Sequence, residues 1–199
     1  MGMMRMTLVF FAIILAGLQI GHAQGVKKEY EKSIKAEEIP AEVLELVSPI
    51  LEEGSGIEYF EEFNGQDRSF EIKMEWREKQ ISVEFYEDGR LMDIERLISF
   101  DEIGEDARGN IQKYLESYAR YKIIRLQRQY SAEDQDEEDE EVIEEFIEQD
   151  IEDLTVRYEM VVYLKGHDRY GPYELLFDDE GALINSQEVE RRSPDNVLY

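Results

Sequence analysis

The amino-acid sequence predicts an α+β protein of two tandem repeats, because one stretch of alternating residues occurs twice. The first copy, residues 81–91, reads ISVEFYEDGRL, and the second, residues 173–183, reads YELLFDDEGAL. Each copy alternates apolar with other residues, reaches a Phe, passes through acidic residues to a Gly and resumes at Leu. This order predicts a strand, a tight turn and a second strand. Gly89 and Gly181 are expected at positive-φ turn positions, which a side chain makes costly.

The first repeat, residues 39–100, begins with a helix that opens near Pro40 and ends at Gly54-Ser55-Gly56. Three strands are expected over residues 57–63, 69–77 and 80–87, and a fourth after Gly89. In the second of these strands every other residue is apolar, so one face meets the helix and the other meets solvent. The apolar positions of the helix are Val43, Leu44, Val47, Ile50 and Leu51.

The second repeat, residues 101–190, follows the same order. Its helix is expected over residues 105–119, with Ala107, Ile111, Tyr114, Leu115 and Tyr118 forming one apolar face. Strands follow over residues 122–130 and 155–164 and in the second hairpin copy. We therefore expect each repeat to consist of one helix packed on a three- to four-stranded antiparallel sheet.

An acidic insertion, residues 133–153, separates the first two strands of the second repeat and contains no Lys or Arg. Like charges resist helix formation, so a solvated loop is the first interpretation. An amphipathic helix over residues 140–153 that docks its apolar side is one alternative, because apolar residues recur there at helical spacing: Val142, Ile143, Phe146, Ile147, Ile151 and Leu154. Docking of a basic partner on the acidic run is another.

The N-terminus has the pattern of a secretory signal peptide. A basic residue, Arg5, precedes a short apolar run, and Gly21-His22-Ala23 follows it. We expect cleavage after residue 23, because the apolar run is shorter than the roughly 20 residues of a membrane span. Residues 24–38 are then expected to form a flexible leader and residues 191–199 a tail, and the mature protein to be periplasmic or secreted without stable membrane insertion.

The composition excludes several classes of function. The chain has 48 Asp and Glu against 22 Lys and Arg, a net charge of −26, so nucleic acid is an unfavourable partner. It has no Cys, and His167 is the single His after the predicted signal peptide. The chain therefore has too few thiolate and imidazole ligands for a typical zinc site. No motif of a catalytic nucleophile is present. Pairs of carboxylates could act in acid–base catalysis, but in so acidic a chain such pairs arise by chance and do not indicate it. We expect no enzymatic activity and no cofactor.

The repeated hairpin motif resembles that of the beta-lactamase-inhibitor-like PepSY-like domain proteins of bacterial envelopes. The motif F-x-x-D-G-x-L stands here as Phe85, Asp88, Gly89 and Leu91. It occurs again, with Glu in place of Asp, as Phe177, Glu180, Gly181 and Leu183. The resemblance covers residues 39–190. It implies a helix on a curved antiparallel sheet in each repeat, with the two sheets joined edge to edge. It also implies a protein that binds proteins or peptides, inhibition of an exported enzyme being one form, and it supplies no catalytic residues.

Two candidate sites remain. Val161, Tyr163 and Leu176 are apolar at strand positions expected to face solvent, which is typical of a partner-binding surface. The alternative is that the insertion folds back and covers them. The second is a candidate calcium site, because hard oxygen ligands cluster in the insertion at Asp134, Asp136, Glu138 and Asp139.

The sequence thus predicts an exported, non-enzymatic protein- or peptide-binding module. The alternative function is a calcium-binding or structural envelope protein.

Overall fold

The computed structural model describes residues 26–27, 29–133, 138–166 and 169–189. Its strands form one sheet in the order β1-β10-β9-β8-β7-β6-β5-β4-β3-β2. The strands are β1 (Val26–Lys27), β2 (Glu29–Ile34), β3 (Ser55–Asn64), β4 (Asp67–Trp76), β5 (Lys79–Tyr86), β6 (Leu91–Leu97), β7 (Arg120–Ala132), β8 (Leu154–Lys165), β9 (Tyr170–Asp178) and β10 (Leu183–Val189). The helices are α1 (Ala41–Leu46), α2 (Ser48–Glu53), α3 (Glu105–Glu116) and α4 (Asp139–Glu148), with short 3-10 turns η1 (Ala36–Glu38) and η2 (Phe100–Glu102).

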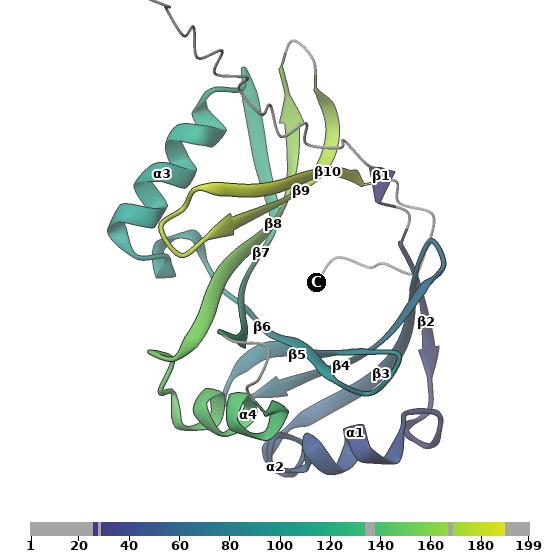
Figure 1. Ribbon diagram of the computed structural model, residues 1–199. Coiled ribbons are helices and arrows are strands. Elements are labelled where there is room, and N and C mark those ends of the chain that lie inside the picture. Colours follow the sequence, from purple (N-terminus) through teal and green to yellow (C-terminus); the bar gives the residue numbers. More distant parts are fainter. Residues whose placement is uncertain (1–25, 28, 134–137, 167–168, 190–199) are drawn as a thin grey trace, which may run out of the picture.

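The sheet curves into a nearly closed ring, and the α-helices of the described residues, α1 to α4, lie outside it (Figure 1). Strands β2 to β10 pair antiparallel with their neighbours, whereas β1 pairs parallel with β10. One residue separates β1 from β2 in the chain, but β1 pairs with β10 and β2 pairs with β3. The N-terminal segment therefore supplies the strands at both edges of the sheet. The apolar cores therefore lie between the convex face and the helices, and the opposite face is concave.

The two halves of the chain share a single sheet. Strand β6 pairs with β7, from Ile94 opposite Tyr130 to Leu97 opposite Gln127. Two separate sheets would leave both strands with unpaired N–H and C=O groups along an edge, and this pairing satisfies them. The prediction of two repeats, each with one helix packed on its own three- to four-stranded sheet, was therefore wrong.

The expected flexible leader, residues 24–38, contains regular structure, so that prediction was wrong for residues 29–34. Strand β2 pairs antiparallel with β3 along its whole length, and the rings of Tyr30 and Phe63 lie 6.4 Å apart. The Lys32 ammonium lies 3.1 Å from the Glu61 carboxylate. The segment is too polar to be recognised as a strand, but pairing with β3 provides its backbone partners.

The first apolar core packs β4 and β5 under α1, α2 and α4. Val43, Val47 and Ile50 of the first two helices are fully buried against it. Helices α1 and α2 follow each other with a break at Val47, and Pro49 lies in the first turn of α2, where its missing N–H costs no hydrogen bond. Helix α4, which also covers this core, belongs to the acidic insertion. The interpretation of that insertion as a solvated loop was therefore wrong for residues 139–148.

The second core lies under α3. Ile111 and Leu115 of α3 are fully buried against Met160, Val162 and Phe177 of the sheet. Each core is thus built from one side of strands whose other side faces the concave surface.

Among the described residues, no helix is long and apolar enough to cross a bilayer. The predicted signal peptide, residues 1–23, and the predicted tail, residues 191–199, lie outside those residues.

Candidate functional site

The concave face of the sheet is lined by carboxylates. In β4, Phe70, Ile72 and Met74 point to the core, so Glu71 and Lys73 lie on the opposite side. Direct cross-strand partners extend this side from β2 through β9. We name this surface the acidic face; its carboxylates are Glu31, Glu62, Glu71, Glu84, Asp93, Glu95, Glu159 and Glu174.

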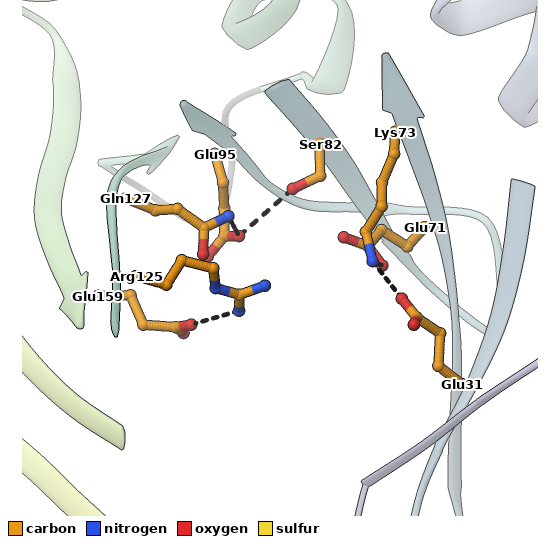
Figure 2. Close-up of polar contacts among 8 residues, drawn as sticks. All are labelled: Glu31, Glu71, Lys73, Ser82, Glu95, Arg125, Gln127 and Glu159. Carbon is orange, nitrogen blue, oxygen red and sulfur yellow. Dashed lines mark hydrogen bonds and ion pairs between the residues drawn. The ribbon is translucent and has the colours of Figure 1, made fainter. Parts of the chain in front are cut away.

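Glu31, Glu62 and Glu71 form one cluster on the acidic face, which we name the Lys73 triad, with carboxylate oxygens within 4.8 Å of one another. The Lys73 ammonium pairs with Glu31 and lies 2.8 Å from Oε2 of Glu71 (Figure 2). The ammonium also lies 4.6 Å from the centre of the Phe60 ring. Burial alone would lower the pKa of Lys73, but the Glu71 and Glu31 carboxylates outweigh it and raise that pKa. This cluster holds an ammonium group as an integral part of the structure.

A second cluster, the Glu84 triad, consists of Glu84 on β5 and Asp93 and Glu95 on β6. Its carboxylate oxygens also lie within 4.8 Å of one another. Asp93 and Glu95 are 6 % and 2 % exposed. Burial, followed by the neighbouring carboxylates of Asp93 and Glu95, raises the pKa of Glu84 well above its usual value.

Polar side chains from adjacent strands hold Glu95 in place. The hydroxyl of Ser82 donates to Oε2 of Glu95 at 3.3 Å, and the amide of Gln127 donates to the same oxygen (Figure 2). Arg125, on the same strand as Gln127, has its guanidinium 3.3 Å from the carboxylate of Glu159 on β8. Burial would lower the pKa of Arg125, but Glu95 and Glu159 outweigh it and raise that pKa.

The predicted partner-binding residues lie on the same concave surface. Leu176 is paired with Glu159, and Val161 with Glu174, so apolar and acidic side chains alternate there. Val161 is only 6 % exposed. Tyr163 and Leu176 are half-buried. We name Val161, Tyr163 and Leu176 the apolar patch.

Tyr163 forms a pair with a second aromatic residue. Its ring meets that of Tyr170 edge to face, with centres 5.6 Å apart. A hydrogen bond with Tyr170 raises the pKa of the Tyr163 hydroxyl. Since Tyr170 is 70 % exposed, this pair extends the apolar patch toward the solvent-exposed end of the β8–β9 hairpin.

The acidic insertion does not cover the apolar patch. The ring of Phe146 packs on Trp76 and Tyr130 in the first core, and Ile147 contacts the same core. The alternative in which these side chains fold over Val161 and Tyr163 was therefore wrong, because α4 lies on the opposite side of the sheet.

The predicted calcium ligands of the insertion are only partly described. Asp134 and Asp136 lie outside the described residues, as does His167. Glu138 immediately precedes α4, and the carboxylate of Asp139 accepts a hydrogen bond from the Leu91 N–H at 2.8 Å. The described contact of Asp139 therefore anchors α4 to the start of β6.

Alternation in the expected strand over residues 80–87 predicts that Ser82 and Glu84 point outward, but the sequence did not indicate their grouping with Asp93, Glu95 and Gln127. The alternation in MDIER, residues 92–96, could have assigned Asp93 and Glu95 to the outward side of the fourth strand. The contribution of Gln127 depends on the pairing of β6 with β7, for which the sequence carries no local signal.

Comparisons with known proteins bear on the fold. No protein family and no curated protein matches the sequence. Among solved structures, the chain is similar to a DUF2874 family protein from Bacteroides ovatus, with a TM-score of 0.50 and 9 % identity, over 74 % of this chain and 85 % of that one. This likeness supports a fold shared with that DUF2874 family protein. At such low identity it concerns the fold alone.

Proposed function

We propose that this chain is an exported, non-enzymatic binding protein whose concave surface takes a cationic segment of a protein or peptide. The observation that carries the proposal is the combination of the acidic face and the apolar patch on one curved surface. A polypeptide with basic and apolar side chains is complementary to both.

The Lys73 triad supports the choice of a cationic partner. It is an example, inside this protein, of an ammonium group held by carboxylates and an aromatic ring of the acidic face. The net charge of −26 adds long-range attraction, which raises the rate at which a basic partner arrives.

The repeated F-x-x-D-G-x-L motif supports a finer proposal, that the two halves derive from PepSY-like units. Inhibition of an exported enzyme is one form that such binding takes. The enzyme would then present a basic or mixed basic and apolar segment to the concave surface.

The test is the binding of a fluorescent peptide of alternating Lys and Leu to the chain from Gln24 to Tyr199, measured by anisotropy at low and moderate salt. Tyr163→Glu places a charge in the apolar patch, and we expect at least tenfold weaker binding at moderate salt. Tyr30→Glu is the matched control, because Tyr30 is exposed on the opposite side of the sheet from Glu31.

The salt dependence distinguishes binding at the apolar patch from attraction of the basic peptide by net charge alone. Attraction by net charge alone is screened over about 10 Å at 0.1 M salt. Binding that disappears at moderate salt, or that both Tyr variants change equally, would contradict the proposal. If the peptide binds as expected, affinity capture from an envelope extract with both variants as baits would then identify the natural partner.

A further inference from the structure

The Glu84 triad brings three carboxylates together where few water molecules can screen them. Glu84 and Asp93 are direct cross-strand partners, and Glu95 is two residues along β6 on the same side. Like charges at such separations oppose one another strongly when partly removed from water.

A neighbouring group independently indicates a cation. Gln127 is 7 % exposed, and its amide donates to Oε2 of Glu95. The carbonyl oxygen of that amide, Oε1, is buried and accepts no hydrogen bond from any described residue. A buried acceptor without a donor costs roughly 1–3 kcal/mol. Because both atoms belong to one amide group, Oε1 lies beside the carboxylate of Glu95, on the side chain that reaches the triad (Figure 2).

Carboxylates and an amide carbonyl are the hard oxygen ligands that calcium and magnesium take in proteins. We propose that Glu84, Asp93, Glu95 and Gln127 Oε1 bind one hard divalent cation, with calcium the better fit. Calcium accepts six to eight oxygen ligands in variable geometry, so water molecules complete its coordination. This site lies outside the acidic insertion. It lies on the acidic face, and it goes beyond the proposed function by assigning three carboxylates of that face to a metal ion.

The Lys73 triad shows why the cation site is restricted to one of the two clusters. There the ammonium of Lys73 already pairs with Glu31 and Glu71, and a divalent ion would have to displace it. The two clusters therefore differ. The ammonium of Lys73 lies between carboxylates of the first cluster, whereas the cation beside the second, Arg125, acts on Glu95 from β7 and forms its ion pair with Glu159.

The test is isothermal titration of calcium and magnesium into chelator-treated mature chain, together with thermal melting. We expect one calcium per chain and a melting temperature that rises with calcium concentration. Sodium chloride at equal ionic strength controls for general screening of the acidic surface.

Three variants locate the ion. Glu84→Gln, Asp93→Asn and Gln127→Leu are each expected to weaken calcium binding at least tenfold. Glu84→Gln also removes like-charge repulsion, so it should fold at least as stably as the wild type without calcium. Glu62→Gln in the Lys73 triad and Glu138→Gln before α4 are the controls, and both should leave affinity unchanged.

Two results would overturn the proposal. One is the absence of heat and of any melting shift at about 10 mM calcium, well above the dissociation constants of extracellular calcium modules. The other is binding that survives all three variants, which would place the ion elsewhere. Peptide binding is tested separately by the Tyr163→Glu variant in chelator-treated protein, because Tyr163 belongs to the apolar patch and not to the Glu84 triad.

Discussion

The indole of Trp76 on β4 stacks on the ring of Phe146 on α4, with ring centres 5.3 Å apart and an angle of 29° between the planes. The two residues come from opposite halves of the chain. Their contact makes the acidic insertion of the second half part of the apolar core of the first. The neighbouring Arg77 supports the same contact, because its guanidinium donates to the Ile147 carbonyl at 2.8 Å.

Phe146→Ala should destabilise the protein by about 3–5 kcal/mol, because it removes a buried aromatic side chain from this core. Trp76 is the single Trp, so its fluorescence reports directly on whether α4 stays packed. We expect a red shift of its emission and a lower urea midpoint. Glu144→Ala, at an exposed position of the same helix, should change neither. Unaltered emission in the Phe146 variant would show that α4 does not pack on Trp76 in solution.

Gly181→Ala should destabilise the protein more than Gly89→Ala. Both glycines have positive φ, +81° and +88°, so an added side chain costs roughly 1–2 kcal/mol at either. A Cβ at residue 181 would also lie 2.3 Å from the backbone oxygen of Ala107 in α3. At residue 89 the nearest atom, in the side chain of Glu42, is 3.5 Å away. Equal losses in urea unfolding would contradict the close approach of the β9–β10 turn to α3.

Lys73→Met should cost about 3–5 kcal/mol at pH 7, because it leaves Glu31 and Glu71 as partly buried carboxylates without their shared cation. The pKa of Lys73 is higher in the folded protein than the value of about 10.4 in the unfolded chain. The wild type therefore keeps the stabilisation by these ion pairs at every pH below about 10.4 and loses it as the pH rises through the folded pKa. Combining Lys73→Met with Glu71→Gln should recover part of the loss. Denaturant unfolding of the wild type, the single variant and the double variant measures this. A Lys73→Met variant as stable as the wild type would refute the ion-pair assignment.

Glu102 should make stability depend on pH at the acidic end. Hydrogen bonds from the Ser99 N–H and hydroxyl, at 2.8 Å each, and the ammonium of Lys79 lower the pKa of Glu102 to about 2. Since this pKa is depressed, the stabilisation is complete above the unfolded value of about 4.3 and is lost as the pH falls toward 2.

Glu102→Gln should therefore cost on the order of 1 kcal/mol at pH 7, a value reduced because the side chain is 36 % exposed and screened by solvent. The difference from wild type should vanish near pH 2. Urea midpoints measured between pH 2 and pH 7 check this, and a difference independent of pH would indicate lost packing instead of lost charge interactions.

The positions of most strands could be predicted from the sequence. Alternation at period two depends only on the side-chain order within one strand, so β4 and β5 were expected within a residue or two of their observed ends. The helical spacing of Ala107, Ile111 and Leu115 likewise placed α3. The outward positions Tyr163 and Leu176 followed from the same alternation.

What the sequence determined by itself was therefore local: the elements, their inward and outward sides, and a strongly acidic surface. Only the tertiary structure decided that β6 pairs with β7, that β2 adds to β3, and that α4 packs on the core of the other half. It also decided that Glu84, Asp93, Glu95 and Gln127 meet. Backbone pairing is available to any two strands, and residues on separate strands become neighbours only through that pairing, so no local pattern encodes which strands will join.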